Sequence, residues 1–109
     1  MPTYNKLVRD KIPQIIMNDG KEPVTKVLNQ EEYKTELRNK SQEELQEYLA
    51  SQSDEAAIEE LADLLEIIHA IAKVHRSSIE EVEKIRQRKV EERGGFEDKI
   101  FLIEVEIDD

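Results

Sequence analysis

The stretch from Glu55 to His75 limits the fold most, because its apolar residues run almost all the way around a helical wheel. Only a narrow stripe of this helix is polar, along Glu59, Glu66 and Lys73. A helix that is apolar on most sides must be covered by other elements or by another subunit. Nowhere does the chain carry the roughly 20 consecutive apolar residues that a membrane span requires. The sequence therefore predicts a mainly α fold in which this helix is buried.

Capping signals predict two helices before this one. After Asp10, a plausible N-cap, isoleucines recur at helical spacing until Gly20, which indicates a short helix. Asn29 followed three residues later by Glu32 is a capping-box pattern. It should open a longer helix that runs to about Ala50 and has an apolar stripe, made of Tyr33, Leu37, Leu45, Tyr48 and Leu49.

A fourth helix and two short strands complete the expected elements. Ser78 and Glu81 form another capping-box pattern, and Gly94 with the glycine after it should end that helix. The residues from Pro23 to Leu28 and from Lys99 to Ile107 have strand character, the second through alternating apolar positions. We expect a four-helix bundle with a small two-stranded β ribbon.

The size and the aromatic content indicate one domain that assembles with copies of itself. A chain of 109 residues matches one ordinary domain, so we expect residues 1–109 to form a single unit. Two Phe, three Tyr and no Trp are few for a self-sufficient core. Folding is therefore expected to include a partner subunit, in a homodimer or a homotetramer.

The charge and the lack of cysteine exclude several functional classes. With 26 acidic against 16 basic residues the net charge is −10, which disfavours binding to nucleic acid or to an anionic membrane surface and suits divalent cations. Without cysteine there is neither a disulfide framework nor a thiolate zinc site. The start, MPTYNKLVRDK, has no apolar signal core, so a cytoplasmic protein is expected.

Four acidic residues form the candidate metal site. Glu44 and Glu47 are neighbours on one predicted helix, and Glu60 and Asp63 are neighbours on the next. Acidic pairs are common on solvated helix faces, but Glu60 and Asp63 fall in an apolar sector that holds no Lys or Arg. Burial of two carboxylates there is costly unless a cation compensates their charge. Four oxygen ligands from facing helices predict a site for Mg²⁺, with Mn²⁺ as a substitute.

Two basic clusters could hold the phosphates of a substrate. On the fourth predicted helix the apolar face continues as Arg86, Lys89 and Arg93. Such residues also favour a helix C-terminus through the helix dipole, so they have a purely structural explanation as well. Near the amino terminus, Lys6 and Arg9 could either reach phosphates or belong to a solvated face. Arg grips phosphate bidentately and Lys acts as a point charge.

The acidic residues also resemble the signature of a known superfamily. The run Glu43-Glu44-Leu45-Gln46-Glu47, followed by Glu60-Leu61-Ala62-Asp63, looks like the EExxE and ExxD motifs of the MazG superfamily of nucleotide pyrophosphohydrolases. The segments YNKLVRDKIP and KVEERGGF resemble its short house-cleaning branch, so the resemblance covers nearly the whole chain. Where many relatives carry Asn shortly before the Lys of the last helix, this chain has Arg86, Gln87 and Arg88.

The resemblance implies an all-α oligomer that hydrolyses nucleoside triphosphates between the α and β phosphates. The products would be a nucleoside monophosphate and pyrophosphate. On chemical grounds Glu43 or Glu59 could orient or deprotonate the water, although both fit equally well as surface charges. Two alternatives remain open at this stage. One is phosphoribosyl-ATP pyrophosphohydrolase of histidine biosynthesis, and the other is a non-enzymatic acidic helical module that binds a partner.

Overall fold

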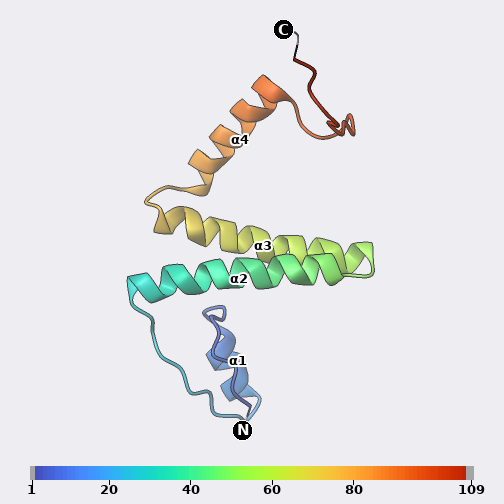
Figure 1. Ribbon diagram of the computed structural model, residues 1–109. Helices are drawn as coiled ribbons and strands as arrows, with labels where there is room; N and C mark the ends of the chain where they lie inside the picture. The colour runs from blue at the N-terminus through green and yellow to red at the C-terminus, as the bar shows by residue number, and fades with distance from the viewer. Residues whose placement is uncertain (1, 108–109) are drawn as a thin grey trace. The chain divides into compact units, whose positions relative to one another are not determined.

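The computed structural model describes residues 2–107 and contains four helices in that range (Figure 1). They are α1 (Ile12–Asn18), α2 (Gln30–Ala50), α3 (Asp54–Val74) and α4 (Ile79–Arg93). The mainly α prediction is confirmed. Contacts within the chain gather in two compact units that divide between Ile79 and Glu80. Among the described residues, no helix has the length and apolar content needed to cross a membrane.

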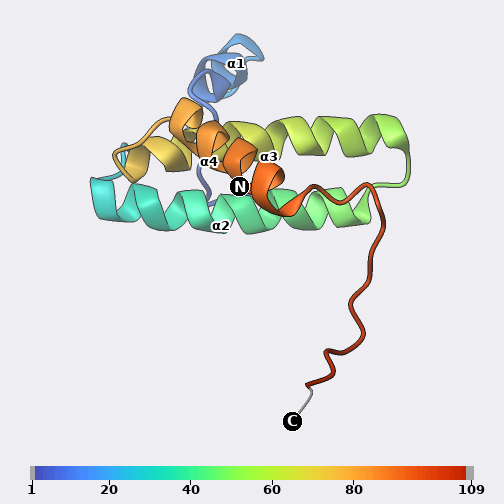
Figure 2. The same cartoon turned by 90° about the horizontal axis from the view of Figure 1, so that it is seen from above.

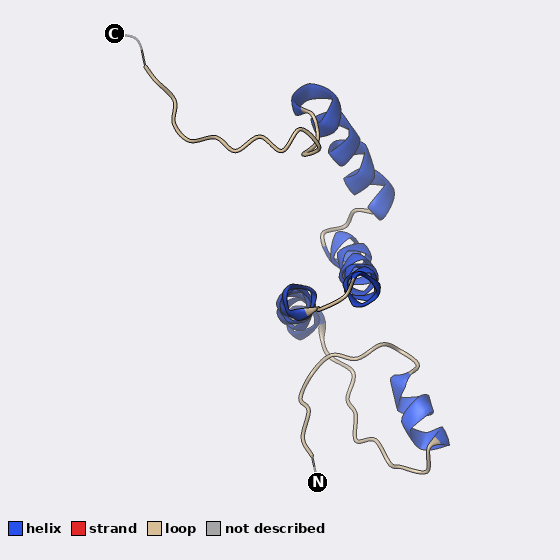
Figure 3. Ribbon diagram, turned by 90° about the vertical axis from the view of Figure 1, so that its right-hand side faces the viewer, coloured by secondary structure: helices blue, strands red, loops and turns tan. Residues whose placement is uncertain are grey.

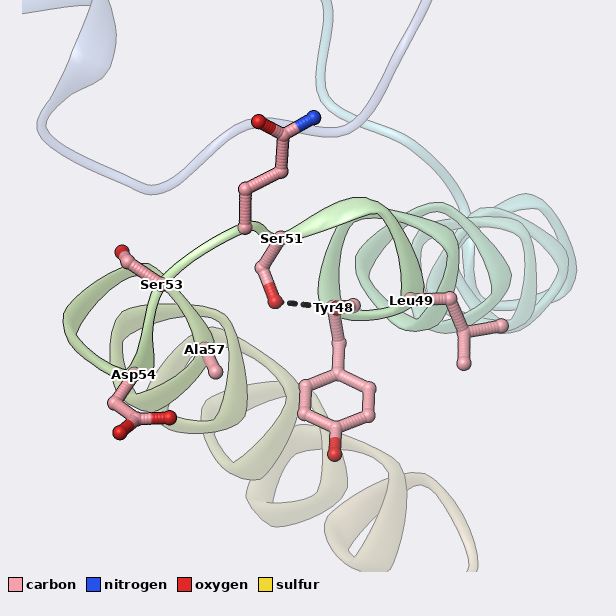
Figure 4. A pocket seen from close by; sticks show the side chains of 7 residues that line it. Tyr48, Leu49, Ser51, Ser53, Asp54 and Ala57 are labelled. Carbon is pink, nitrogen blue, oxygen red and sulfur yellow. Dashed lines mark hydrogen bonds between the residues drawn. The ribbon is translucent and has the colours of Figure 1, made fainter.

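Helices α2 and α3 lie side by side as an antiparallel hairpin, which both Figure 1 and Figure 2 show. The predicted capping box starts α2: the Glu32 backbone N–H donates to Asn29 Oδ1 at 2.9 Å, and the Asn29 N–H donates to Glu32 Oε1 at 3.2 Å. The connection to α3 is short. In it, the Ser51 hydroxyl donates to the Tyr48 carbonyl at 2.6 Å (Figure 4). Ser53 caps α3 by accepting the Ala56 N–H at 3.1 Å.

The hairpin packs through a face whose buried apolar residues lie toward the start of α2 and the end of α3, with a buried carboxylate nearer the turn. Leu37 from α2 and Ile67 and Ala72 from α3 are buried, together with Glu44. Leu45 and Leu49 were expected in the core, but they are 45% and 64% exposed. At about 100° per residue, a face that contains Leu37 and Glu44 turns these two leucines away from α3.

One long side of α3 is left uncovered by the described residues. Its exposed positions recur at intervals of three and four residues, as Ile58, Leu61, Leu65 and Ile68. We call these four residues the α3 stripe. The polar positions Glu59, Glu66 and Lys73 are exposed, as the helical wheel predicts. Helix α2 therefore covers only part of the apolar surface of α3 that was predicted from the sequence to be buried.

Helix α1 starts one residue later than the sequence suggested. Lys11, and not Asp10, occupies the N-cap position, without a side-chain hydrogen bond, and Pro13 lies in the first turn. Proline is tolerated there because that N–H has no partner within the helix. Gly20 follows the helix with a φ of +80°, a left-handed conformation that glycine adopts without strain. The expected end of the helix is confirmed.

Helix α4 begins directly after Ser78 and ends where the glycines predicted. Gly94 has a φ of +82°, and its N–H donates to the Val90 carbonyl at 2.8 Å. This is the left-handed glycine that commonly ends a helix. Among the described residues, all side chains of α4 after its first residue are exposed within their unit.

The predicted β ribbon is not formed by residues 2–107, in which Figure 3 shows helices and loops and no strand. Neither Pro23 to Leu28 nor Lys99 to Ile107 has regular structure, and Val24 and Val27 are 96% and 99% exposed. Two strands alone are marginally stable in water, because each has one neighbour and little apolar cover. Alternating apolar residues were therefore an insufficient signal for a strand.

Candidate metal centre

A buried carboxylate lies on the packed face of the α2–α3 hairpin. Glu44 is only 6% exposed, because it projects from the same face of α2 as Leu37. Its Oε2 atom is buried and has no hydrogen-bond partner among the described residues. A buried carboxylate oxygen without a partner is costly, so this atom points to a ligand that would satisfy it.

Two carboxylates of α3 meet Glu44 across the hairpin. One oxygen from each of Glu44, Glu60 and Asp63 lies within 4.8 Å of the others. Glu60 Oε2 is also buried without a hydrogen-bond partner in the described chain. On the α2 side, Glu43 and Glu47 form a second such group with Glu44. We call these five residues the acidic cluster, and Glu44 belongs to both of its groups.

Three cations contact the acidic cluster from other parts of the same unit. Arg9 donates to Asp63 Oδ1 at 2.7 Å. Lys6 Nζ lies 3.6 Å from Glu43 Oε1. Lys40, one turn before the cluster on α2, lies 3.5 Å from Glu43 Oε1 and 3.6 Å from Glu44 Oε1. Five carboxylates thus face three cations, which leaves two negative charges when all groups are ionised.

The donor set and this charge fit a divalent cation. Carboxylate oxygens are the ligands preferred by Mg²⁺ and Mn²⁺, and the two orphaned oxygens belong to residues on facing helices. Burial, with the neighbouring Glu47 as the second cause, raises the pKa of Glu44 from 4.5 to about 7. The same two causes raise the pKa of Glu60. The hairpin therefore holds negative charge where solvation is poor.

The raised pKa of Glu44 predicts how stability depends on pH without divalent cations. A carboxyl whose folded-state pKa exceeds its unfolded value stabilises the fold below pH 4.5, and this contribution is lost as pH rises through about 7. At about 1.4 kcal/mol for each pKa unit, the loss is roughly 3 kcal/mol. Urea unfolding in EDTA should thus show lower stability at pH 8 than at pH 5. Glu44→Gln should flatten this difference, and a variant with the wild-type pH dependence would contradict the assignment.

The structure brings together most of the residues that the sequence singled out in the first two thirds of the chain. Glu44 is grouped with Glu60 and Asp63 and, separately, with Glu43 and Glu47, of which Glu47 is exposed. Lys6 and Arg9 are also at the cluster, but in the structure their partners are carboxylates. Glu59 is exposed and belongs to neither acidic group.

Lys40 was not expected at the site. The lack of Lys and Arg in the apolar sector of the third helix predicted carboxylates without a cationic partner, whereas Lys40 comes from α2 and Arg9 from the amino-terminal segment. A signal was present, because Lys40 lies four residues before Glu44, the spacing of neighbours on one helix face.

The predicted phosphate ligands of α4 belong to the second unit. Arg86 is engaged within its own helix, where its Nε donates to Glu83 Oε1 at 2.9 Å and a second guanidinium nitrogen pairs with the same oxygen. This contact lowers the pKa of Glu83 and raises that of Arg86. Lys89 and Arg93 are exposed and make no ion pair with another described residue.

A surface depression of about 400 Å³ lies away from the acidic cluster, at the α2–α3 turn. Figure 4 shows its lining side chains, which include Tyr48, Leu49 and Asp54. Among the described residues that line it, the only carboxylate is that of Asp54, in the first turn of α3, where a negative charge suits the helix dipole. We therefore place the candidate functional site at the acidic cluster and not at this depression.

Comparison with known proteins gives one partial similarity. No family model matches the chain, and no solved structure matches it. The chain is 41% identical over 54 residues to a protein of Mycolicibacterium smegmatis described as uncharacterized. The aligned region covers 50% of this chain and 55% of that protein, so the chain spans about half the length of this relative. The description of the relative gives no activity, and functional inference rests on the site itself.

Proposed function

We propose that the chain is a Mg²⁺-dependent nucleoside triphosphate pyrophosphohydrolase of the MazG type. The observation that carries the proposal is the buried Glu44 carboxylate, whose unpartnered oxygen lies in a group with Glu60 and Asp63 of the facing helix. Carboxylates on a solvated acidic face are normally exposed, whereas Glu44 is only 6% exposed. The order of the two acidic motifs along the chain resembles that of the MazG superfamily, and this resemblance also supports the proposal.

Glu44, Glu47, Glu60 and Asp63 would hold the metal ion. When bound, Mg²⁺ supplies charge stabilisation for phosphoryl oxygens and a water of lowered pKa. The residues around it have separate roles in the proposal. Glu43 is grouped with Glu44 and Glu47, whereas Glu59 is exposed and lies outside both groups, so we assign the orientation of the attacking water to Glu43.

The basic residues would neutralise the charge that develops on the phosphates. Lys89 and Arg93 of α4 are the main candidates, because Arg86 is already paired with Glu83. This role requires α4 to face the acidic cluster of its own chain or of another subunit. Positioned cations of this kind are the main catalytic device in phosphoryl transfer.

A pyrophosphate-release screen over nucleoside triphosphates, with and without Mg²⁺, tests the proposal directly. We expect release that requires Mg²⁺ and is supported partly by Mn²⁺, with a nucleoside monophosphate as the second product. Phosphoribosyl-ATP belongs in the same screen, because hydrolysis of this substrate alone would move the assignment to the histidine-pathway enzyme. No release from any nucleotide would favour a non-enzymatic interaction module.

Self-association is part of the same proposal. The α3 stripe leaves large apolar side chains exposed, with Ile58 at 65% and Leu65 at 52%. Contiguous exposed apolar surface of this kind marks interfaces. We expect a homodimer or a homotetramer in which a second copy covers the stripe.

Leu65→Asp should shift the assembly toward monomer, because it places a charge at the centre of the α3 stripe. Analytical ultracentrifugation at micromolar concentration checks this, with circular dichroism as the test that α3 remains helical. Glu66→Lys is the matched control, a charge change at the next residue on the exposed polar side. A wild-type chain that sediments as an active monomer would contradict the proposal.

A further inference from the structure

The amino-terminal segment is tied to both helices of the hairpin by its basic residues. Lys6 pairs with Glu43 on α2, and Arg9 pairs with Asp63 on α3. We call residues 6–9 the basic strap. Both of its anchors are members of the acidic cluster, so the strap contacts the proposed metal centre from two sides.

Arg9 and a divalent cation would compete for the same carboxylate. Asp63 is grouped with Glu44 and Glu60 as a candidate ligand, and its Oδ1 accepts a hydrogen bond from Arg9 at 2.7 Å. A divalent cation beside Asp63 repels the guanidinium and reduces the negative charge that attracts it. Lys6 experiences the same change at Glu43.

The strap is held weakly enough to be displaced. The side chains of Arg9 and Lys6 are 59% and 44% exposed, and those of their acidic partners 40% and 34%. Ion pairs with this exposure contribute little to stability, because water screens them and ordering the side chains has an entropic cost. In contrast, Glu44 offers a buried oxygen with no partner in the described chain, which favours an incoming cation.

From these contacts we infer that the basic strap is a cation-released element: a divalent metal ion binding at the acidic cluster displaces Arg9 and Lys6 from their carboxylates and makes both side chains available to an anionic ligand. This inference rests on the proposed metal centre. Arginine released beside a carboxylate-bound metal is suited to grip a phosphate bidentately. The strap would then contribute phosphate contacts only after the metal has bound.

Reciprocity gives the inference a test that needs no substrate. If the metal weakens the hold on the strap, the strap must weaken metal binding by the same factor. Calorimetric titration with Mn²⁺ should therefore show tighter binding by Arg9→Ala than by wild type, by about three- to tenfold for the loss of one charge at this distance. Arg9→Lys, which keeps the charge, should bind Mn²⁺ as the wild type does.

Lys21→Ala is the matched control for net charge. Lys21 pairs with Asp19 at 3.6 Å, and neither residue belongs to the acidic cluster. The substitution changes the charge of the protein as Arg9→Ala does. It should leave the Mn²⁺ affinity within about twofold of wild type, because the ion pair of Lys21 lies outside the cluster and salt screens exposed charges.

Release of the strap can also be observed directly, because the chain has no cysteine and a single introduced one can be labelled. A nitroxide on Val8→Cys, between the two anchors, should give a sharper spectrum when Mg²⁺ is added. A nitroxide on Gln52→Cys, at the α2–α3 turn, should not change.

The outcomes separate this inference from the function on which it rests. Wild-type protein that binds no Mn²⁺ would overturn both the metal centre and the strap. Wild-type protein that binds Mn²⁺, with equal or weaker binding by Arg9→Ala, would overturn the strap alone and make Arg9 a residue that orients Asp63. A label at position 8 that does not respond to Mg²⁺ would also overturn the strap alone.

Discussion

Glu60→Gln should abolish Mg²⁺-dependent pyrophosphate release, with a loss of more than about a hundredfold in kcat/KM. The substitution replaces a proposed charged oxygen ligand with a neutral amide in the acidic cluster. Loss of a partner that merely supports a ligand typically lowers metal affinity or activity by about 10- to 100-fold, and loss of the ligand itself should have a larger effect. Asp63→Asn should behave in the same way.

The fold should survive these substitutions, because Glu60 Oε2 is a buried oxygen that has no hydrogen-bond partner among residues 2–107. A neutral amide at this position removes repulsion from Glu44, Glu47 and Asp63. Far-ultraviolet circular dichroism and the urea midpoint check that α3 is intact. Glu66→Gln makes the same chemical change on the exposed side of α3 and should keep full activity. Normal turnover by Glu60→Gln would remove the metal-site assignment.

Lys89→Ala and Arg93→Ala should each lower kcat/KM by about 10- to 100-fold. The expected loss corresponds to one charge-assisted hydrogen bond to a phosphate, roughly 1.5 to 3 kcal/mol of transition-state stabilisation. Because both side chains are exposed in their own unit, protein stability should change little. Steady-state kinetics with the nucleotide found in the screen measures the effect.

Arg88→Ala is the control that separates geometry from charge. Arg88 lies on the same helix and carries the same charge, but it points in a different direction on the helical wheel. If Lys89 and Arg93 serve only as partners of the helix dipole, their loss should cost stability of about 0.3 to 1 kcal/mol and leave the kinetics near normal. Equal and small effects of all three substitutions would exclude a phosphate clamp.

Local signals were sufficient to predict the helices. The Asn29 and Glu32 capping box appears in the structure with both of its hydrogen bonds, and the glycines at positions 20 and 94 adopt positive φ angles at the helix ends. These features depend on residues three or four apart, so the sequence contains them directly. The same holds for the acidic pairs, whose spacing places Glu60 and Asp63 on one face of α3.

Features that depend on distant segments were not predictable in this way. Nothing in the spacing of Arg9 and Asp63 indicates that they meet, because the contact joins the amino-terminal segment to α3. Leu45 was expected in the core because it is apolar. Which face of α2 is covered depends instead on how α3 packs against it, and the covered face carries Leu37 and Glu44. Likewise, the alternating residues after Lys99 could form a strand only with a partner, which the described chain does not supply.

The short connection between α2 and α3 also bears on how quickly the site can assemble. All five carboxylates of the acidic cluster lie between positions 43 and 63, on two helices joined by the turn at Ser51 and Ser53. Closing so short a loop has a small entropic cost, and proteins rich in such local contacts fold within microseconds to milliseconds. The hairpin can thus form early and bring the carboxylates together before the rest of the chain has folded. Cations available at that stage would favour the helical pair by offsetting repulsion among these residues.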